Sequence, residues 1–275
     1  MIIEYSARSH TGWVREKNED NLFINGVTLP DGDRERPFAI DGRASDGRKT
    51  ICGVAVGKPA APFIFAVFDG MGGEEDGEVA SGIAAQSLSA FASDIASAPV
   101  KEIDVTVQSF VDSVHESIVA DSGNDVRMGT TLALVVAAGG KLRCFNVGDS
   151  RVFVYRRGVF SQVTNDHTLA AEMALNPEDF AAEQAPGFGV ARLGKLTRCI
   201  GIGDAHTIES YQPTRGKCRV LVCSDGLTDM VDFPDIENVM RGSVRAAGAA
   251  DELLDMALDN GGRDNITLIV ADVKP

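Results

Sequence analysis

The chain has 275 residues, of which 44% are hydrophobic and 24% charged, a composition that suits a globular protein with a well-buried core. Its 40 acidic and 26 basic residues give a formal net charge of -14, which argues against a nucleic-acid backbone or an anionic membrane surface as the main partner. We expect a single domain over residues 1–275, in preference to two small ones.

Neither a membrane span nor a disulfide framework is predicted. No run of about 18 apolar residues occurs, and the start of the chain lacks the basic and apolar regions of a signal peptide, so we expect a cytoplasmic protein. The five cysteines form no C-x-x-C pair, and we expect them to be small buried residues rather than zinc ligands or disulfides. They are Cys52, Cys144, Cys199, Cys218 and Cys223.

The strands and helices can be predicted from hydrophobic periodicity. In chain order, strands are predicted at 63–68, 131–138, 142–147, 152–155, 219–223 and 266–273, and helices from about 77 past 91, at 105–119 and at 245–260. Asp104 is the expected N-cap of the second helix, and Gly261-Gly262 ends the third. Turns at Gly139-Gly140 and Arg156-Arg157-Gly158 predict an antiparallel meander in the centre of the chain.

The resulting fold class is α+β, because the central strands lack the helical crossovers of a parallel sheet. Residues 26–62 are rich in Gly, Asp, Arg and Pro, and we expect a long surface loop or a small extra hairpin there.

Five short stretches place an aspartate at the mouth of a strand-like run. They are Asn18-Glu19-Asp20, Asp69-Gly70-Met71-Gly72-Gly73, Gly148-Asp149-Ser150, Ser224-Asp225-Gly226 and Asp264-Asn265. Carboxylates gathered at strand ends are costly unless cations lie between them. This pattern predicts a site for several hard divalent cations.

The individual motifs carry different weight. Asp-Gly is also an ordinary turn dipeptide, but Asp69 and Asp225 both follow an apolar strand and precede a glycine, and two such elements strengthen the prediction. Asp264 precedes a strand instead, as a neighbouring antiparallel strand requires. Arg15 suits a phosphate oxygen, although a charged run such as 15–20 is more often a solvated loop.

The histidines are expected to be structural. His10, His115 and His206 carry no motif, so surface or boundary positions are expected for them. His167 opens a stretch, 168–194, whose prolines and glycines suggest a mobile flap, and we favour a structural over a catalytic role for it.

In order and content these blocks resemble the metal-dependent Ser/Thr protein phosphatases of the PPM, or type 2C, family, and bacterial single-domain members most of all. The matching stretches are Gly12 to Asp20, Ala66 to Ser81, Gly129-Thr130-Thr131, Asn146 to Arg151, Asp166-His167-Thr168, Leu196 to Gly201, Ser224 to Asp229 and Gly262 to Thr267. They span nearly the whole chain in family order. The resemblance implies a central antiparallel β-sandwich flanked by helices on both faces, a four-layer αββα arrangement, with the flap at 168–194.

The resemblance also implies roles for individual residues toward two Mn²⁺ or Mg²⁺ ions. Asp69 matches the ligand that bridges both ions, assisted by the Gly70 carbonyl, while Asp225 and Asp264 match the other carboxylates of one ion. Glu19 matches an outer ligand through water, and Asp20 a residue that holds metal-bound water. Asp149 matches a ligand that, with Asp225, holds a weaker third ion. Arg15 matches the phosphate-binding arginine.

The chain departs from the family pattern at two positions of this site. Eukaryotic members carry a histidine, proposed as general acid, where this chain has Met71. Bacterial relatives often have histidine where this chain has Glu74-Glu75-Asp76, and we expect this acidic rim to weaken binding of acidic phosphopeptides.

The expected activity is hydrolysis of phosphoserine and phosphothreonine in proteins. Two cations would lower the pKa of a shared water, orient it toward phosphorus and offset charge on the phosphoryl oxygens, with Arg15, Asp69, Asp225 and Asp264 as the catalytic set. The expected partners are phosphoproteins that a Ser/Thr kinase modifies, with no nucleic acid and no membrane, and the expected state is a monomer. The alternatives are a pseudophosphatase that only binds phosphoproteins and a hydrolase of small phosphoesters.

Overall fold

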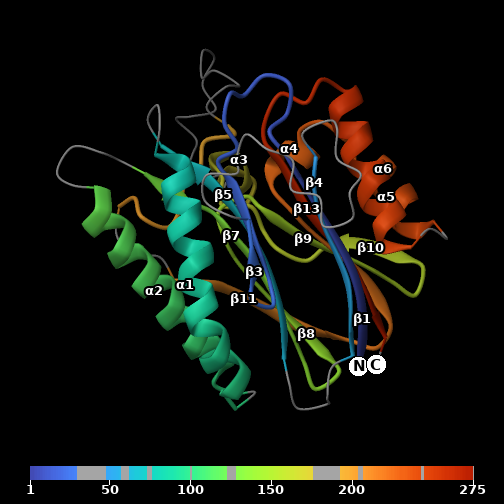
Figure 1. The fold of residues 1–275 in the computed structure, drawn as a ribbon, viewed down its shortest axis with the longest axis horizontal. Helices are drawn as coiled ribbons and strands as arrows, with labels where there is room; N and C mark the ends of the chain where they lie inside the picture. Colours follow the sequence, from blue (N-terminus) through green and yellow to red (C-terminus); the bar gives the residue numbers. More distant parts are fainter. Residues whose placement is uncertain are drawn as a thin grey trace.

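The computed structural model describes residues 1–29, 48–56, 62–72, 76–99, 101–122, 128–175, 193–203, 207–242 and 245–274. Its centre is built from two antiparallel sheets that pack face to face, with helices outside both (Figure 1). Among these residues, no helix combines the length and apolar character needed to cross a bilayer.

Within the described residues, one sheet has six strands. In spatial order these are β10 (Val159–Gln162), β9 (Arg151–Arg156), β12 (Cys218–Cys223), β13 (Ile266–Lys274), β1 (Ile2–His10) and β4 (Lys49–Val56). Ile2 lies opposite Lys274 in the β1–β13 pair, so the two ends of the chain lie side by side (Figure 1).

The other sheet has seven strands in the part of the chain that the structure describes. In spatial order these are β11 (Glu209–Arg215), β8 (Lys141–Val147), β7 (Leu132–Ala138), β5 (Phe63–Met71), β2 (Asp20–Ile24) and β3 (Val27–Thr28), and the short β6 (Gly129–Thr130) pairs with β5 outside this order.

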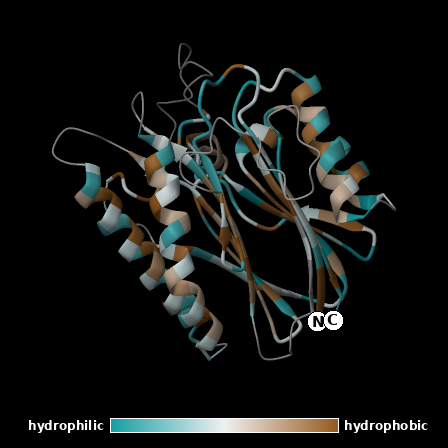
Figure 2. Ribbon diagram, viewed as in Figure 1, coloured by the Kyte–Doolittle hydropathy of each residue, from teal (hydrophilic) through white to brown (hydrophobic). Residues whose placement is uncertain are grey.

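Alternation along β5 shows how the sequence builds the layers. Phe63, Phe65 and Val67 point into the core between the sheets, whereas Ile64 and Phe68 point into the core under the helices. Both faces are buried, which is why this strand reads as a continuous apolar run (Figure 2).

Six helices occur in the described residues: α1 (Gly77–Ser97), α2 (Ile103–Ser122), α3 (Leu169–Leu175), α4 (Asp225–Thr228), α5 (Phe233–Arg241) and α6 (Ala246–Asp259). The first two cover the seven-stranded sheet, and α4 to α6 cover the six-stranded sheet (Figure 1). Leu253 and Leu254 of α6 are fully buried, and burial of each side chain stabilises the folded state by about 1.5–3 kcal/mol. The predicted αββα sandwich and its long helices are confirmed.

The predicted meander is wrong, although both of its hairpins exist. Gly139 and Gly140 form the β7–β8 turn, and Arg157 and Gly158 the β9–β10 turn, all four with positive φ. However, β8 pairs with β11 and β9 with β12, in different sheets. The chain therefore crosses between sheets at 148–150.

Two smaller expectations also differ from the structure. Helix α2 begins at Ile103, and Asp104 pairs with Arg143 of β8 instead of capping the helix. Residues 26–62 were expected to form a surface loop or a small hairpin. Within them β3 does form a hairpin with β2, but Lys49–Val56 is a strand of the six-stranded sheet that pairs with β1, which was not predicted. Residues 30–47 and 57–61 lie outside the described chain.

Candidate active site

Antiparallel pairing brings all five acidic stretches to one end of the sandwich. Asp20 begins β2 and lies directly opposite Asp69 near the end of β5. Asp225 follows β12, Asp264 precedes β13, and Asp149 lies at the crossing from β8 to β9. The aspartates that the sequence places at strand ends therefore lie close together in the structure.

A cleft of about 510 Å³ opens at this end. Its lining contains every predicted site residue except Asp20, which lies beneath it: Arg15, Glu19, Asp69, Gly70, Asp149, Asp225 and Asp264. Met71 is also in the lining, and 193–203 supplies a further wall that includes Lys195 and Cys199. Glu74, Glu75 and most of the expected flap, 176–192, lie outside the described residues, whereas Asp76 immediately precedes α1.

Close backbone approach explains the glycines of the motifs. A Cβ at Gly70 would lie 2.0 Å from the Gly77 carbonyl oxygen, and one at Gly226 would lie 1.9 Å from the Asn265 carbonyl oxygen. A side chain at either position would force these segments apart. The glycines therefore allow the segments that carry Asp69 and Asp225 to approach their neighbours closely.

Hydrogen bonds hold the carboxylate of Asp20 and the backbone of Asp69 and Glu19. Ser224 Oγ donates to Asp20 Oδ2 over 2.8 Å, and the Asp69 backbone N–H donates to Thr131 Oγ1 over 3.0 Å. The Asn265 side chain accepts from the Glu19 N–H (2.7 Å) and donates to the carbonyls of Thr11 and Lys17.

The roles of Ser224, Thr131 and Asn265 were not predicted. Their partners lie 62 or more residues away along the chain in the first two contacts, and Ser, Thr and Asn are common turn residues. Lys195 was missed as well, because its place in the cleft depends on how 193–203 returns to the sheet.

The crowded carboxylates hold protons unusually tightly. Burial raises the pKa of Asp20 to about 7, and burial followed by the Asp225 charge raises the pKa of Asp149 to about 7. Burial, then the charges of Asp229 and Asp264, raises the pKa of Asp225 to about 6. Burial and the Asp20 charge raise the pKa of Asp69 well above its usual range.

The donor set fits hard divalent cations. Asp20 Oδ1 is buried and has no hydrogen-bond partner among the described residues, as expected of an oxygen that faces an ion or its water. No three acidic, histidine or cysteine side chains of the described chain are close enough to enclose an ion by themselves. Oxygen donors arranged in this open way suit ions that keep several waters, as Mg²⁺ does.

Arg15 lies at the rim of this site. Its Nη2 donates to Asp264 Oδ2 over 2.7 Å, and its Nη1 lies 3.8 Å from Glu19 Oε2. The side chain is 48% exposed, so an incoming anion can reach the guanidinium.

Comparison with known proteins identifies the family. The family model for protein phosphatase 2C matches residues 52–259, which is most of the chain. The chain belongs to the protein phosphatase 2C family. The resemblance read from the sequence is thereby confirmed.

Relatives within the 2C family agree with this assignment. The chain is 33% identical over 225 residues to the serine/threonine phosphatase stp of Listeria innocua, an alignment that covers 80% of this chain and 88% of that protein. It is 27% identical to the serine/threonine protein phosphatase PstP of Mycobacterium tuberculosis, over 99% of this chain and 45% of that protein.

Solved structures of the 2C family share the fold. The crystal structure of M. tuberculosis PstP/Ppp superposes with a TM-score of 0.74 at 26% identity, covering all of both chains. The PstP catalytic domain in complex with two manganese ions superposes with a TM-score of 0.71 at 28% identity, covering 100% of this chain and 99% of that one.

The described histidines and cysteines of this 2C phosphatase are buried or partly buried. His167 and His10 are both buried, so the expectation of a surface or boundary position was wrong for His10, whose Nδ1 accepts the Gly12 N–H. His115 lies at the boundary as expected and accepts the Gly201 N–H, while His206 is outside the described residues. Burial raises the pKa of Cys223 to about 12, and Cys144, Cys199 and Cys218 are buried as predicted.

Proposed function

We propose that this serine/threonine protein phosphatase uses two divalent ions, Mn²⁺ or Mg²⁺, held at the strand ends by Asp69, Asp225 and Asp264. The observation that carries the proposal is the convergence of five acidic strand ends on one cleft, with a buried and unpartnered oxygen on Asp20. The two manganese ions in the PstP catalytic domain support the same number and kind of ion.

We assign the other ligands by the same logic. Asp69 lies opposite Asp20 in the β2–β5 pair, and with the adjacent Gly70 carbonyl it would be the ligand shared by both ions. Glu19, in the cleft lining, and Asp20, which is buried and outside that lining, would act through water. Asp149, at the sheet crossing, would provide with Asp225 a weaker third position.

The ions, when bound, supply a nucleophilic water of lowered pKa and offset negative charge on the phosphoryl oxygens. Arg15 binds and orients the phosphate through its planar fork of donors. Met71 cannot donate the proton that the leaving alkoxide needs, so water or another group must do so. Cysteine attack is disfavoured, because burial raises the pKa of Cys199, the thiol in the cleft lining.

The substrates proposed are phosphoserine and phosphothreonine proteins that a Ser/Thr kinase modifies, and the chain is proposed to act in the cytoplasm as a monomeric single domain. The relatives named as serine/threonine phosphatases support this substrate class. Asp69, Asp225 and Asp264 all line the cleft, which argues against a pseudophosphatase that only binds its target.

The test is an assay of p-nitrophenyl phosphate and a phosphothreonine peptide with EDTA, Mg²⁺ or Mn²⁺. We expect metal-dependent turnover that falls about a hundredfold or more in Asp69→Asn, Asp225→Asn and Asp264→Asn, because each change removes a ligand charge without emptying the core. The matched control is Asp94→Asn, an exposed acid on α1 that should retain full activity.

Two outcomes would overturn the proposal. Full activity in all three ligand variants would reject the metal assignment. No turnover from the folded protein with either metal would favour a pseudophosphatase that only binds phosphoproteins. Faster hydrolysis of a nucleotide than of a folded phosphoprotein would assign the site to small phosphoesters.

A further inference from the structure

A second cleft, of about 720 Å³, opens at the end of the six-stranded sheet away from the carboxylates. Its lining residues come mainly from the β9–β10 turn, the start of β12, the end of β13, the end of α5 and the residue before α6. Figure 1 shows where these elements lie in the fold. Cys218 begins β12 in this cleft, whereas Asp225 follows the other end of β12. About 17 Å of strand separates the two sites, so the cleft is not part of the phosphatase centre.

The lining of this cleft is strongly basic in an acidic protein. It contains six cationic residues and two acidic ones, Glu4 and Asp272, in a chain whose net charge is -14. The cationic residues are Arg156, Arg157, Lys217, Arg219, Arg245 and Lys274. Gathering like charges in one concave surface costs free energy unless an anion offsets them.

The acidic groups of the cleft do not neutralise these cations. Asp272 is bound by Arg219 through two hydrogen bonds of 2.7 and 2.9 Å, and Arg219 also reaches the carbonyls of Met240 and Gly242 at the end of α5. Among the described residues, the other five cations form no ion pair with an acidic side chain within 4.0 Å. Five basic side chains are therefore available to a ligand.

Arg157 occupies a position that its residue type does not favour. It lies in the β9–β10 turn with φ 53°, in the left-handed region, followed by Gly158 with φ 84°. Such a turn favours Asn-Gly, and an arginine there costs about 1 kcal/mol or more. Retaining arginine at this strained point presents a guanidinium to the cleft.

The start of α6 adds the positive end of a helix dipole. Arg245 is the N-cap residue of this 14-residue helix, its side chain makes no capping hydrogen bond, and the first turn has no acidic residue. A basic side chain at the positive end of a helix dipole is unfavourable by itself. An anion in the cleft would offset this repulsion. It could also accept hydrogen bonds from the backbone N–H groups of the first turn.

We propose that this cleft binds a ligand with a chain of two or three linked phosphate groups, either an inorganic polyphosphate or the phosphate chain of a nucleotide. The four arginines offer the planar forks that suit phosphate oxygens, and the excess of basic over acidic side chains matches the charge of a triphosphate. The volume lies within the usual range for small-ligand sites.

The test is calorimetric titration of the full chain with inorganic triphosphate, ATP and inorganic phosphate, in buffer without added divalent ions. We expect Arg157→Asn and Arg245→Ser each to weaken triphosphate binding about tenfold, as loss of one charge-assisted contact does. Asparagine suits the left-handed turn and serine suits an N-cap, so both variants should melt at or above the temperature of the parent chain. Lost binding would then not result from lost folding.

Two further variants complete the design. Asp69→Asn, which disables the candidate metal centre, should bind triphosphate as the parent does, and so should Lys101→Asn, which removes an exposed cation before α2. Equal affinity for triphosphate and ATP would show that the phosphate chain alone is recognised. Tighter binding of ATP would show that the cleft also contacts the nucleoside. No binding, equal affinity for inorganic phosphate, unchanged affinity in both cleft variants, or loss of binding in Asp69→Asn would overturn the proposal.

Discussion

At the residue scale, the gathering of the aspartates at one end of the fold could be predicted, whereas the residues that hydrogen-bond to them could not. An apolar strand followed by Asp-Gly identified Asp69 and Asp225 because the signal is local. Asn265 forms its contacts with segments near residues 11–19, about 250 positions away, and no sequence period encodes such a contact. Gly226 is required by the Asn265 carbonyl rather than by a turn angle, which also depends on tertiary packing.

Arg15 provides a prediction at this scale, because it combines an exposed guanidinium with a carboxylate partner 2.7 Å away. We expect Arg15→Ala to raise KM for p-nitrophenyl phosphate about tenfold while kcat changes less, since phosphate binding is lost before metal binding. Arg15→Lys should recover part of this loss, because it keeps the charge without the bidentate fork. Steady-state kinetics at saturating Mn²⁺ would measure both, and an unchanged KM in Arg15→Ala would remove Arg15 from phosphate binding.

At the element scale, local signals identified the hairpins but not the sheets to which they belong. Turn chemistry at 139–140 and 157–158 fixed β7–β8 and β9–β10 as pairs. It carried no information on the three residues 148–150, where the chain leaves one sheet for the other. The central strands of both sheets are buried on both faces, so the sequence of a strand does not show to which sheet it belongs.

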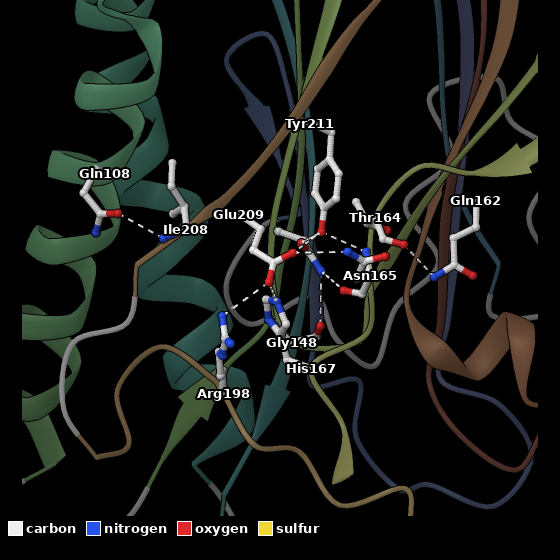
Figure 3. A network of polar contacts seen from close by, with 11 residues as sticks. Gln108, Gly148, Gln162, Thr164, Asn165, His167, Arg198, Ile208, Glu209 and Tyr211 are labelled. Carbon is white, nitrogen blue, oxygen red and sulfur yellow. Dashed lines mark hydrogen bonds and ion pairs between the residues drawn. The ribbon is translucent and has the colours of Figure 1, made fainter. Parts of the chain in front are cut away.

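A polar network holds this crossing in place (Figure 3). The Gly148 N–H donates to His167 Nδ1 over 3.0 Å, and His167 Nε2 lies 3.1 Å from Glu209 Oε1. Tyr211 donates to the Glu209 carboxylate over 2.8 Å. Through these contacts β11 positions the loop that carries Asp149, and His167 has the structural role expected from the sequence.

We predict that His167→Ala lowers the free energy of unfolding by about 1–3 kcal/mol, because it leaves the buried Gly148 N–H without an acceptor. His167→Asn should recover much of the loss, since its amide oxygen can replace Nδ1. Urea unfolding of the two variants beside the parent chain would measure this difference. Equal destabilisation by alanine and asparagine would show that ring packing, and not the hydrogen bond, holds the crossing.

At the scale of the whole molecule, charge is divided between the two ends of the sandwich. Carboxylates with raised pKa values gather at one end, and an unneutralised basic cleft lies at the other. The hydrophobic pattern predicted the layers between them, because each layer is set by alternation along single strands. It did not predict the basic cleft, whose cations come from four separated segments.

The acidic end makes the stability of the metal-free protein depend on pH in an unusual direction. A carboxyl whose pKa is higher folded than unfolded stabilises the fold at low pH, and this contribution is lost as pH rises toward the folded value. Asp20, Asp149 and Asp225, at about 7, 7 and 6, act in this way between pH 5 and 7. Burial lowers the pKa of His167, so this one group makes stability rise with pH, opposite to the effect of the carboxyls.

We therefore predict that the melting temperature of the metal-free chain falls by about 5 °C between pH 5 and 7, because the carboxyls outnumber the histidine. Saturating Mn²⁺ should reverse the slope, since ions bind only the deprotonated carboxylates. Differential scanning calorimetry in EDTA and in Mn²⁺ would measure both slopes, with Asp20→Asn expected to flatten the metal-free slope and Asp94→Asn to leave it unchanged. A metal-free melting temperature that rises from pH 5 to 7 would mean that these carboxyls are ionised without ions, and that the acidic end is stabilised by the protein alone.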